Sequence, residues 1–145
     1  MMVEKEREKE LGLFDKKQWK NKIDIKNITA FDCYENFVLI GDDKGYLFSY
    51  DLNEKTFECL SDHQVEVNKG YKIEGIKCHS SINVAYVISN GSAYIYSIPK
   101  LEKYHKSDVK DIVKYSVNNH HSRSNEIVFV TKKKKLKFME YSHEM

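Results

Sequence analysis

The chain has 145 residues, a length that suits one domain with a sizeable core rather than two. Hydrophobic residues make up 41% of it and charged residues 32%, which is typical of a globular chain and argues against a disordered one. The net charge of +2 is too small to predict nucleic acid as a partner, so any basic surface must be local.

The three cysteines, Cys33, Cys59 and Cys78, are odd in number and show no Cys-x-x-Cys spacing. This pattern argues against a disulfide framework and a zinc site, and it favours a reducing, cytoplasmic setting.

Residues 1–10 are a charge run without an apolar stretch, so they do not form a secretory signal. No later run is long enough to cross a bilayer, and we therefore expect membrane contact to be peripheral.

Residues 1–22 form a charged N-terminal segment. Acidic and basic side chains alternate from Glu4 to Glu10, and the apolar side chains of Leu11, Leu13, Phe14 and Trp19 follow. The plainer interpretation is a solvated helix or a frayed tail, and a partner-binding helix is the less favoured alternative. Leu13, Phe14 and Trp19 offer a means of tethering the segment to the body of the protein.

From residue 23 onwards, short apolar runs alternate with turn signals, which is the pattern of many short strands. Ten Tyr and seven Phe against one Pro favour the same interpretation, because aromatic side chains pack well across strands. The first four strand candidates are Ile28 to Phe31, Phe37 to Ile40, Tyr46 to Leu52 and Thr56 to Leu60. Four strands with short connections are the content of one antiparallel propeller blade.

The same order of short strands and turns recurs further along the chain. The second set of candidates is Ile73 to Cys78, Val84 to Ile88, Ala93 to Ile98 and Leu101 to His105. Gly45 and Gly91 lie 46 residues apart, as do Tyr50 and Tyr96. That interval is close to the length of a propeller blade.

A third, looser copy comprises Ile112 to Val117, Ile127 to Val130 and Leu136 to Tyr141. When the third strands of the three copies are matched, Tyr50, Tyr96 and Met139 fall at one position. Along the first of these strands, Phe48, Tyr50 and Leu52 are expected to share one face. A single sheet cannot bury such a face alone. We therefore expect Tyr50, Tyr96 and Met139 to point into the spaces between neighbouring sheets.

The predicted fold class is all-β, a partial β-propeller of about three four-stranded antiparallel blades within residues 23–145. The blades span approximately 23–62, 71–106 and 109–143. About three blades leave apolar end faces that a closed propeller would cover, so we expect self-association through the open faces or further blades from a longer chain.

Three segments together resemble a known family. They are "ITAFDCYENFVLIGDDKGYLFSYDL" (28–52), "VAYVISNGSAYIYSIPKLE" (84–102) and "IVFVTKKKKLKFMEY" (127–141). In this order they resemble successive blades of the citron homology (CNH) domain, closest to the form at the N-terminus of the vacuolar-sorting tether subunits of the HOPS and CORVET complexes. These residues hold neither the family's remaining blades nor the helical solenoid that follows in the tethers, which suggests a fragment or a divergent small relative.

The resemblance implies a non-enzymatic protein-interaction module in vesicle-mediated protein transport. The implied partners are a Rab-type small GTPase and other tether subunits. The implied location is the cytoplasm, peripheral on endosomal or vacuolar membranes. Alternatives are the CNH domain of a Rho-pathway kinase or exchange factor, a generic WD40-like scaffold fragment and, less favoured, a propeller enzyme.

Lys132, Lys133, Lys134 and Lys135 are the dense charge cluster of the body. The plainer interpretation is a hairpin turn with solvated lysines that discourage strand pairing at the edge. The functional interpretation is a patch for anionic lipid or an acidic partner, each lysine contributing about 1 kcal/mol near a charged bilayer.

No catalytic, cofactor-binding or metal-binding residue is predicted. His79, His105 and the pair His120-His121 have no ligand-spaced partner, and loop histidines are commonly solvated. Cys33 and Cys78 occupy equivalent strand ends, where we expect them to pack as small hydrophobes. Asp42 and Asp43 lie in a hairpin turn that favours Asp for backbone reasons, and no glycine-rich phosphate loop is present.

Overall fold

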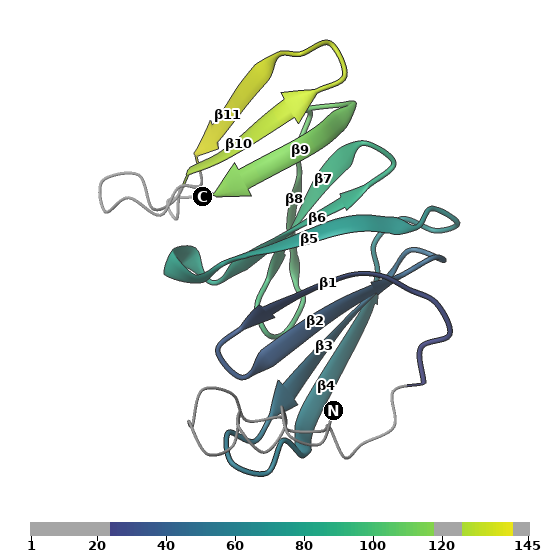
Figure 1. Ribbon diagram of the computed structural model, residues 1–145, viewed down its shortest axis with the longest axis vertical. Helices are drawn as coiled ribbons and strands as arrows, with labels where there is room; N and C mark the ends of the chain where they lie inside the picture. The colour runs from purple at the N-terminus through teal and green to yellow at the C-terminus, as the bar shows by residue number, and fades with distance from the viewer. Residues whose placement is uncertain (1–23, 118–125, 141–145) are drawn as a thin grey trace, which may run out of the picture.

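The computed structural model describes residues 24–117 and 126–140. Within these ranges the chain forms strands in three antiparallel sheets, with a single short 3-10 helix at Ser80–Ile82. The sheets stack in chain order, so that the second lies between the first and the third (Figure 1). The predicted N-terminal segment, 1–22, lies outside the described residues.

Sheets 1 and 2 each have four strands in sequential order. Sheet 1 contains β1 (Ile28–Tyr34), β2 (Phe37–Asp42), β3 (Tyr46–Leu52) and β4 (Cys59–Glu66). Sheet 2 contains β5 (Ile73–His79), β6 (Val84–Ser89), β7 (Ser92–Ser97) and β8 (Lys103–Lys106). The prediction of four-stranded antiparallel repeats is confirmed for these two sheets.

Strand β4 begins later than the sequence pattern predicts. The side chain of Asn53 accepts hydrogen bonds from the backbone N–H groups of Lys55 and Thr56, at 2.9 and 3.1 Å. Phe57 adopts a φ of 58°, a left-handed conformation that interrupts an extended strand. The predicted start at Thr56 is therefore wrong, and β4 runs from Cys59 to Glu66.

Sheet 3 contains β9 (Ile112–Val117), β10 (Glu126–Thr131) and β11 (Leu136–Glu140), in the order β11-β10-β9. The described residues thus give this sheet three strands, whereas four per blade were expected. The sequence itself offers three apolar runs in this region, and each of them became a strand.

Sheet 2 is apolar on both faces, and the alternation of side chains along its two central strands explains why. Ala85, Val87, Tyr94 and Tyr96 pack against sheet 1, together with Leu39 and Leu47 of that sheet. The intervening residues face the other way and pack against Ile127 and Phe129 of sheet 3; they are Tyr86, Ile88, Ala93 and Ile95. Full burial of each large side chain contributes roughly 1.5–3 kcal/mol, so the stacking of the sheets supplies the core.

Tyr96 and Met139 point into the spaces between sheets, as predicted. Tyr50 does not, and the prediction for this residue is wrong. On β3, Leu47 and Ser49 are buried, whereas Phe48 and Tyr50 lie half-buried on the outer face of sheet 1. Tyr50 is equivalent to Tyr96, which faces the preceding sheet, and no described sheet precedes sheet 1.

The pairing of β3 with β4 shifts register between Asp51 and Leu52, where Leu60 is the extra residue on β4. In the second repeat, Tyr94, Tyr96 and Ile98 all belong to the core between sheets 1 and 2.

We expect Tyr96→Ala to lower the free energy of unfolding by about 3–5 kcal/mol, because it leaves a cavity between two sheets. Tyr50→Ala, at the equivalent position on an outer face, should cost clearly less, and Lys133→Ala in an exposed turn should change stability by about 0.5 kcal/mol or less. Urea unfolding of the three variants measures this order. Equal losses for Tyr96→Ala and Tyr50→Ala would contradict the assignment of inner and outer faces.

Candidate functional site

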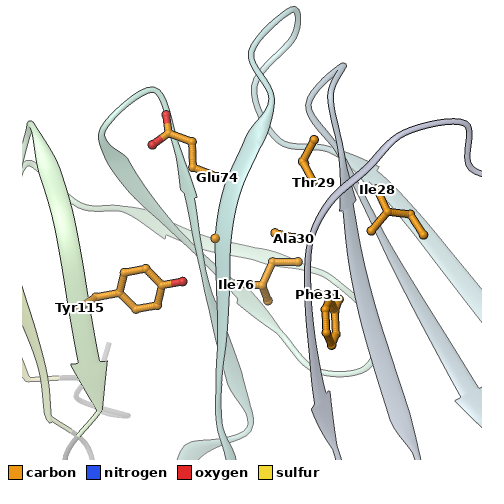
Figure 2. A pocket seen from close by; sticks show the side chains of 8 residues that line it. Ile28, Thr29, Ala30, Phe31, Glu74, Ile76 and Tyr115 are labelled. Atoms are coloured by element: carbon orange, nitrogen blue, oxygen red, sulfur yellow. The ribbon is translucent and has the colours of Figure 1, made fainter.

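A groove of about 410 Å³ runs along the first strands of the three sheets. Strands β1 and β5 form most of its walls, and β9 contributes one side chain (Figure 2). The lining residues are Ile28, Thr29, Ala30, Phe31, Glu74, Gly75, Ile76 and Tyr115. The groove therefore draws on one strand from each repeat.

Two side chains of β1 fasten this strand to β5 across the boundary between sheets 1 and 2. The hydroxyl of Thr29 donates to the backbone carbonyl of Ile73 at 2.6 Å. The carboxylate of Asp32 accepts the backbone N–H of Cys78 at 2.7 Å and that of Cys33 at 2.9 Å. Because hydrogen bonds to a charged acceptor are strong, Asp32 fixes the relative positions of the two strands beside the groove.

Tyr115 closes the third side of the groove. Its hydroxyl points toward β5 at Gly75 (Figure 2). A Cβ atom on residue 75 would meet that hydroxyl, so glycine leaves the space that the tyrosine ring occupies. Burial, and to a lesser extent the nearby Asp32 carboxylate, raises the pKa of Tyr115, which keeps its hydroxyl protonated and able to donate a hydrogen bond.

The open side of the groove is apolar and aromatic. Phe31 is 70% exposed and Ile28 is 50% exposed, although both lie in a strand. Glu74 adds one exposed carboxylate. An arrangement of apolar side chains, one hydroxyl donor and one carboxylate suits the binding of another molecule's surface, and it contains no pairing of a nucleophile with a base.

The predicted lysine patch lies apart from this groove. Lys132, Lys133, Lys134 and Lys135 are all exposed in the turn between β10 and β11, and none of them lines the groove. The backbone N–H of Lys132 donates to the carbonyl of Asp111 at 2.9 Å, and this bond holds the turn against the segment before β9.

Asp42 and His79, which the sequence analysis singled out, have partners within the fold. Asp42 accepts the backbone N–H groups of Lys44 and Tyr46 at 3.0 and 2.8 Å, which is the backbone role expected of this turn. His79 differs from the expectation of a solvated loop residue: it is buried in β5, with its ring nitrogen Nδ1 3.2 Å from the hydroxyl of Tyr86. His105 lies exposed in β8, and His120-His121 fall, with the rest of the loop 118–125, outside the described residues.

The two equivalent cysteines have different surroundings. Cys78 packs against the core between sheets 1 and 2, as expected of a small hydrophobe. Cys33 is exposed, so the expected packing role is wrong for this residue. The reason is the one that applies to Tyr50: the equivalent position in sheet 1 faces away from sheet 2.

Sequence reasoning did not single out Phe31, Ile28, Glu74 or Tyr115. Apolar residues in a predicted strand suggest a core, and their exposure depends on how the neighbouring sheet is placed. One signal was present in Gly75, an isolated glycine within a strand, since such a glycine often marks the close approach of another group.

The comparisons with known proteins identify the fold. The sequence matches no protein-family model, and no curated protein matches it. Among solved structures, Hsv2 of Kluyveromyces lactis superposes with a TM-score of 0.67 at 9% identity, over 84% of this chain and 40% of that one. A second Hsv2 structure, with complete loop 6CD, gives a TM-score of 0.66 at 9% identity over 82% and 38% of the two chains.

A computationally designed protein, Ika8, is also similar, with a TM-score of 0.55 at 15% identity over 78% of this chain and 33% of that one. The chain thus spans about two fifths of the length of Hsv2, which is a β-propeller. The fold class is a partial β-propeller, as the sequence predicted. None of the described residues forms a helix long and apolar enough to cross a membrane.

We expect Cys78 to resist alkylation. Burial, and then the Asp32 carboxylate, raises the pKa of Cys78 from 9.0 to about 12, so at pH 8 its reactive thiolate is about a thousandfold rarer than that of an ordinary thiol. Treatment with iodoacetamide followed by peptide mass spectrometry should show Cys78 reacting more slowly than Cys33 and Cys59, with its rate still rising above pH 9. Equal rates in urea serve as the control. Labelling of native Cys78 as fast as Cys59 would contradict the burial of Cys78 beside Asp32.

Proposed function

We propose that the chain is a protein-binding module that uses the groove along β1, β5 and β9 to contact an apolar surface of its partner. The exposure of Phe31 carries this proposal. A large aromatic side chain left in water within a concave, mostly apolar site is typical of a protein-binding surface, and such side chains contribute strongly to binding when they are covered.

The partner that we propose is a Rab-type small GTPase, in the setting of an endosomal or vacuolar tether. The resemblance of residues 28–52, 84–102 and 127–141 to the N-terminal propeller of the HOPS and CORVET subunits supports this part of the proposal. The propeller fold agrees with it, since that resemblance implies stacked four-stranded blades. A Rho-type GTPase is the alternative that the wider CNH family implies.

The lysine turn adds a second contact in this proposal. Lys132 to Lys135 are exposed together and lie away from the groove, so they are free to meet an anionic membrane while the groove holds a protein. At about 1 kcal/mol for each lysine near a charged bilayer, four lysines give weak peripheral attachment that supplements the protein contact.

Binding of the full chain to purified GTPases tests the proposal. We expect a Rab-type GTPase to bind more tightly when loaded with a non-hydrolysable GTP analogue than with GDP. Phe31→Ala should weaken this binding by about tenfold or more, because the largest exposed side chain of the groove is lost. The matched control is Leu60→Ala, which removes a side chain that is 62% exposed on β4 and does not line the groove.

Isothermal titration of the wild type and both variants distinguishes the outcomes. Preferential binding of Rho-type GTPases, lost in Phe31→Ala, would favour the Rho-pathway alternative while keeping the groove as the binding surface. Equal weakening by Leu60→Ala, or no nucleotide-dependent binding of either GTPase class, would contradict the proposal.

A further inference from the structure

The outer face of sheet 1 is covered, although no described sheet lies against it. Alternation along β2 and β3 turns Leu39 and Leu47 toward sheet 2 and sends Ile40, Phe48 and Leu52 to the other side. Ile40 is 3% exposed and Leu52 is 7% exposed, yet neither belongs to the cores between the sheets. Something other than sheets 2 and 3 therefore lies over these side chains.

The two ends of the stack differ in this respect. On the outer face of sheet 3, Leu136 is 61% exposed and Phe138 is 62% exposed. On the outer face of sheet 1, Phe48 and Tyr50 are half-buried beside the fully covered Ile40. Both faces are apolar, so apolar character alone does not explain the difference. The cover is specific to sheet 1.

The described chain enters on this same face. Asp24 and Ile25 line a cavity of about 340 Å³ together with Phe48 and Tyr50. Trp19 precedes Asp24 by five residues, so it lies within about 18 Å of Asp24 even if the chain between them is fully extended. Four strands of one sheet span about 15 Å, whereas the third sheet of a stack lies about 20 Å from the first. Trp19 can therefore reach the outer face of sheet 1 but not that of sheet 3.

The composition of the chain before Asp24 matches this face. On β4, Asp62 is paired with Tyr50 and Glu66 with Tyr46, and both carboxylates are exposed at the rim. The chain between positions 11 and 22 combines apolar side chains for the middle of the face with basic ones for its acidic rim. The apolar side chains are Leu11, Leu13, Phe14 and Trp19, and the basic ones are Lys16, Lys17, Lys20 and Lys22. Complementary charges around an apolar contact fix its orientation.

We propose that residues 11–22 lie across the outer face of sheet 1, over β2 and β3, with Trp19 beside Phe48 and Tyr50. The segment then takes the place that sheet 1 itself takes on sheet 2. Ile40 and Phe48 correspond to Val87 and Tyr94, which are buried against sheet 1 in the second repeat.

The cover ends before β1. Phe31 is paired with Ile40 but is 70% exposed, so the segment leaves the groove side of the sheet open. Residues 11–22 thus close one end of the stack without blocking the groove. The outer face of sheet 1 becomes available to another sheet or partner only when the segment is displaced.

Fluorescence of the full 145-residue chain tests the contact, because Trp19 is its single tryptophan. In the native protein, Trp19 should emit at a shorter wavelength than in urea, and acrylamide should quench it severalfold less. Phe48→Ala and Tyr50→Ala should each move the native emission toward the urea value, since they remove the side chains that Trp19 contacts. The matched control is Phe138→Ala on the outer face of sheet 3, which should leave the emission unchanged. Circular dichroism verifies that each variant is folded.

Hydrogen exchange followed by mass spectrometry locates the contact independently. Trp19→Asp puts a charge on the apolar contact and should speed amide exchange in β2 and β3 severalfold, because these strands lose their cover. Trp19→Phe keeps an apolar ring and should retain the protection of the wild type. Exchange in β10 and β11 should be the same in all three proteins.

Several results would overturn the proposal. One is a native Trp19 that emits and is quenched as in urea. Another is an emission shift in Phe138→Ala as large as that in Phe48→Ala and Tyr50→Ala. A folded Trp19→Asp variant whose exchange equals that of the wild type in β2 and β3, or changes only in β10 and β11 or along the groove, would also exclude this placement. If Trp19→Asp does not fold, the fluorescence of the wild type and the alanine variants still decides. None of these outcomes depends on the binding of a GTPase.

Discussion

Sheet 2 has two apolar faces, and this constraint organises the described part of the molecule. The alternation along β6 and β7 sends Val87 and Tyr96 to one side and Tyr86 and Ile95 to the other. Neither face can stay in water, so the sheet requires a neighbour on each side. Sheets 1 and 3 are these neighbours, and each of them consequently has one inner and one outer face (Figure 1).

The groove is a consequence of the same stacking. Because the sheets follow one another, their first strands come to lie along one side of the molecule, and the bonds from Thr29 and Asp32 of β1 to the backbone of β5 hold two of these strands together. The third strand reaches the groove through Tyr115, whose ring fits because residue 75 is glycine. A single sheet would have none of these features, so the candidate site belongs to the stack rather than to any one repeat.

The repeat spacing was sufficient to predict the fold class, since Gly45 with Gly91 and Tyr50 with Tyr96 mark equivalent positions in two sheets. It was not sufficient to say which face of each sheet is covered. Tyr50 and Tyr96 hold equivalent positions in their repeats, but Tyr96 is buried against a preceding sheet, whereas no described sheet precedes Tyr50. The same reason explains why Cys33 is exposed, whereas Cys78 packs against the core.

The start of β4 could not be predicted from the apolar pattern, because hydrogen bonds from the backbone to the Asn53 side chain form a turn where the pattern indicated a strand. The groove could not be predicted from apolar patterning, which does not distinguish an exposed Phe31 from a core residue.

The central claim is that burial of both faces of sheet 2 holds the structure together. Native-state hydrogen exchange on the full chain tests it most directly, since it reports the stability of each strand separately. The account predicts that the amides of β6 and β7 exchange most slowly, at the rate set by global unfolding, while those of the exposed strands β8 and β11 exchange much faster. Slowest exchange in sheet 1 or sheet 3, with β6 and β7 opening independently and early, would contradict it.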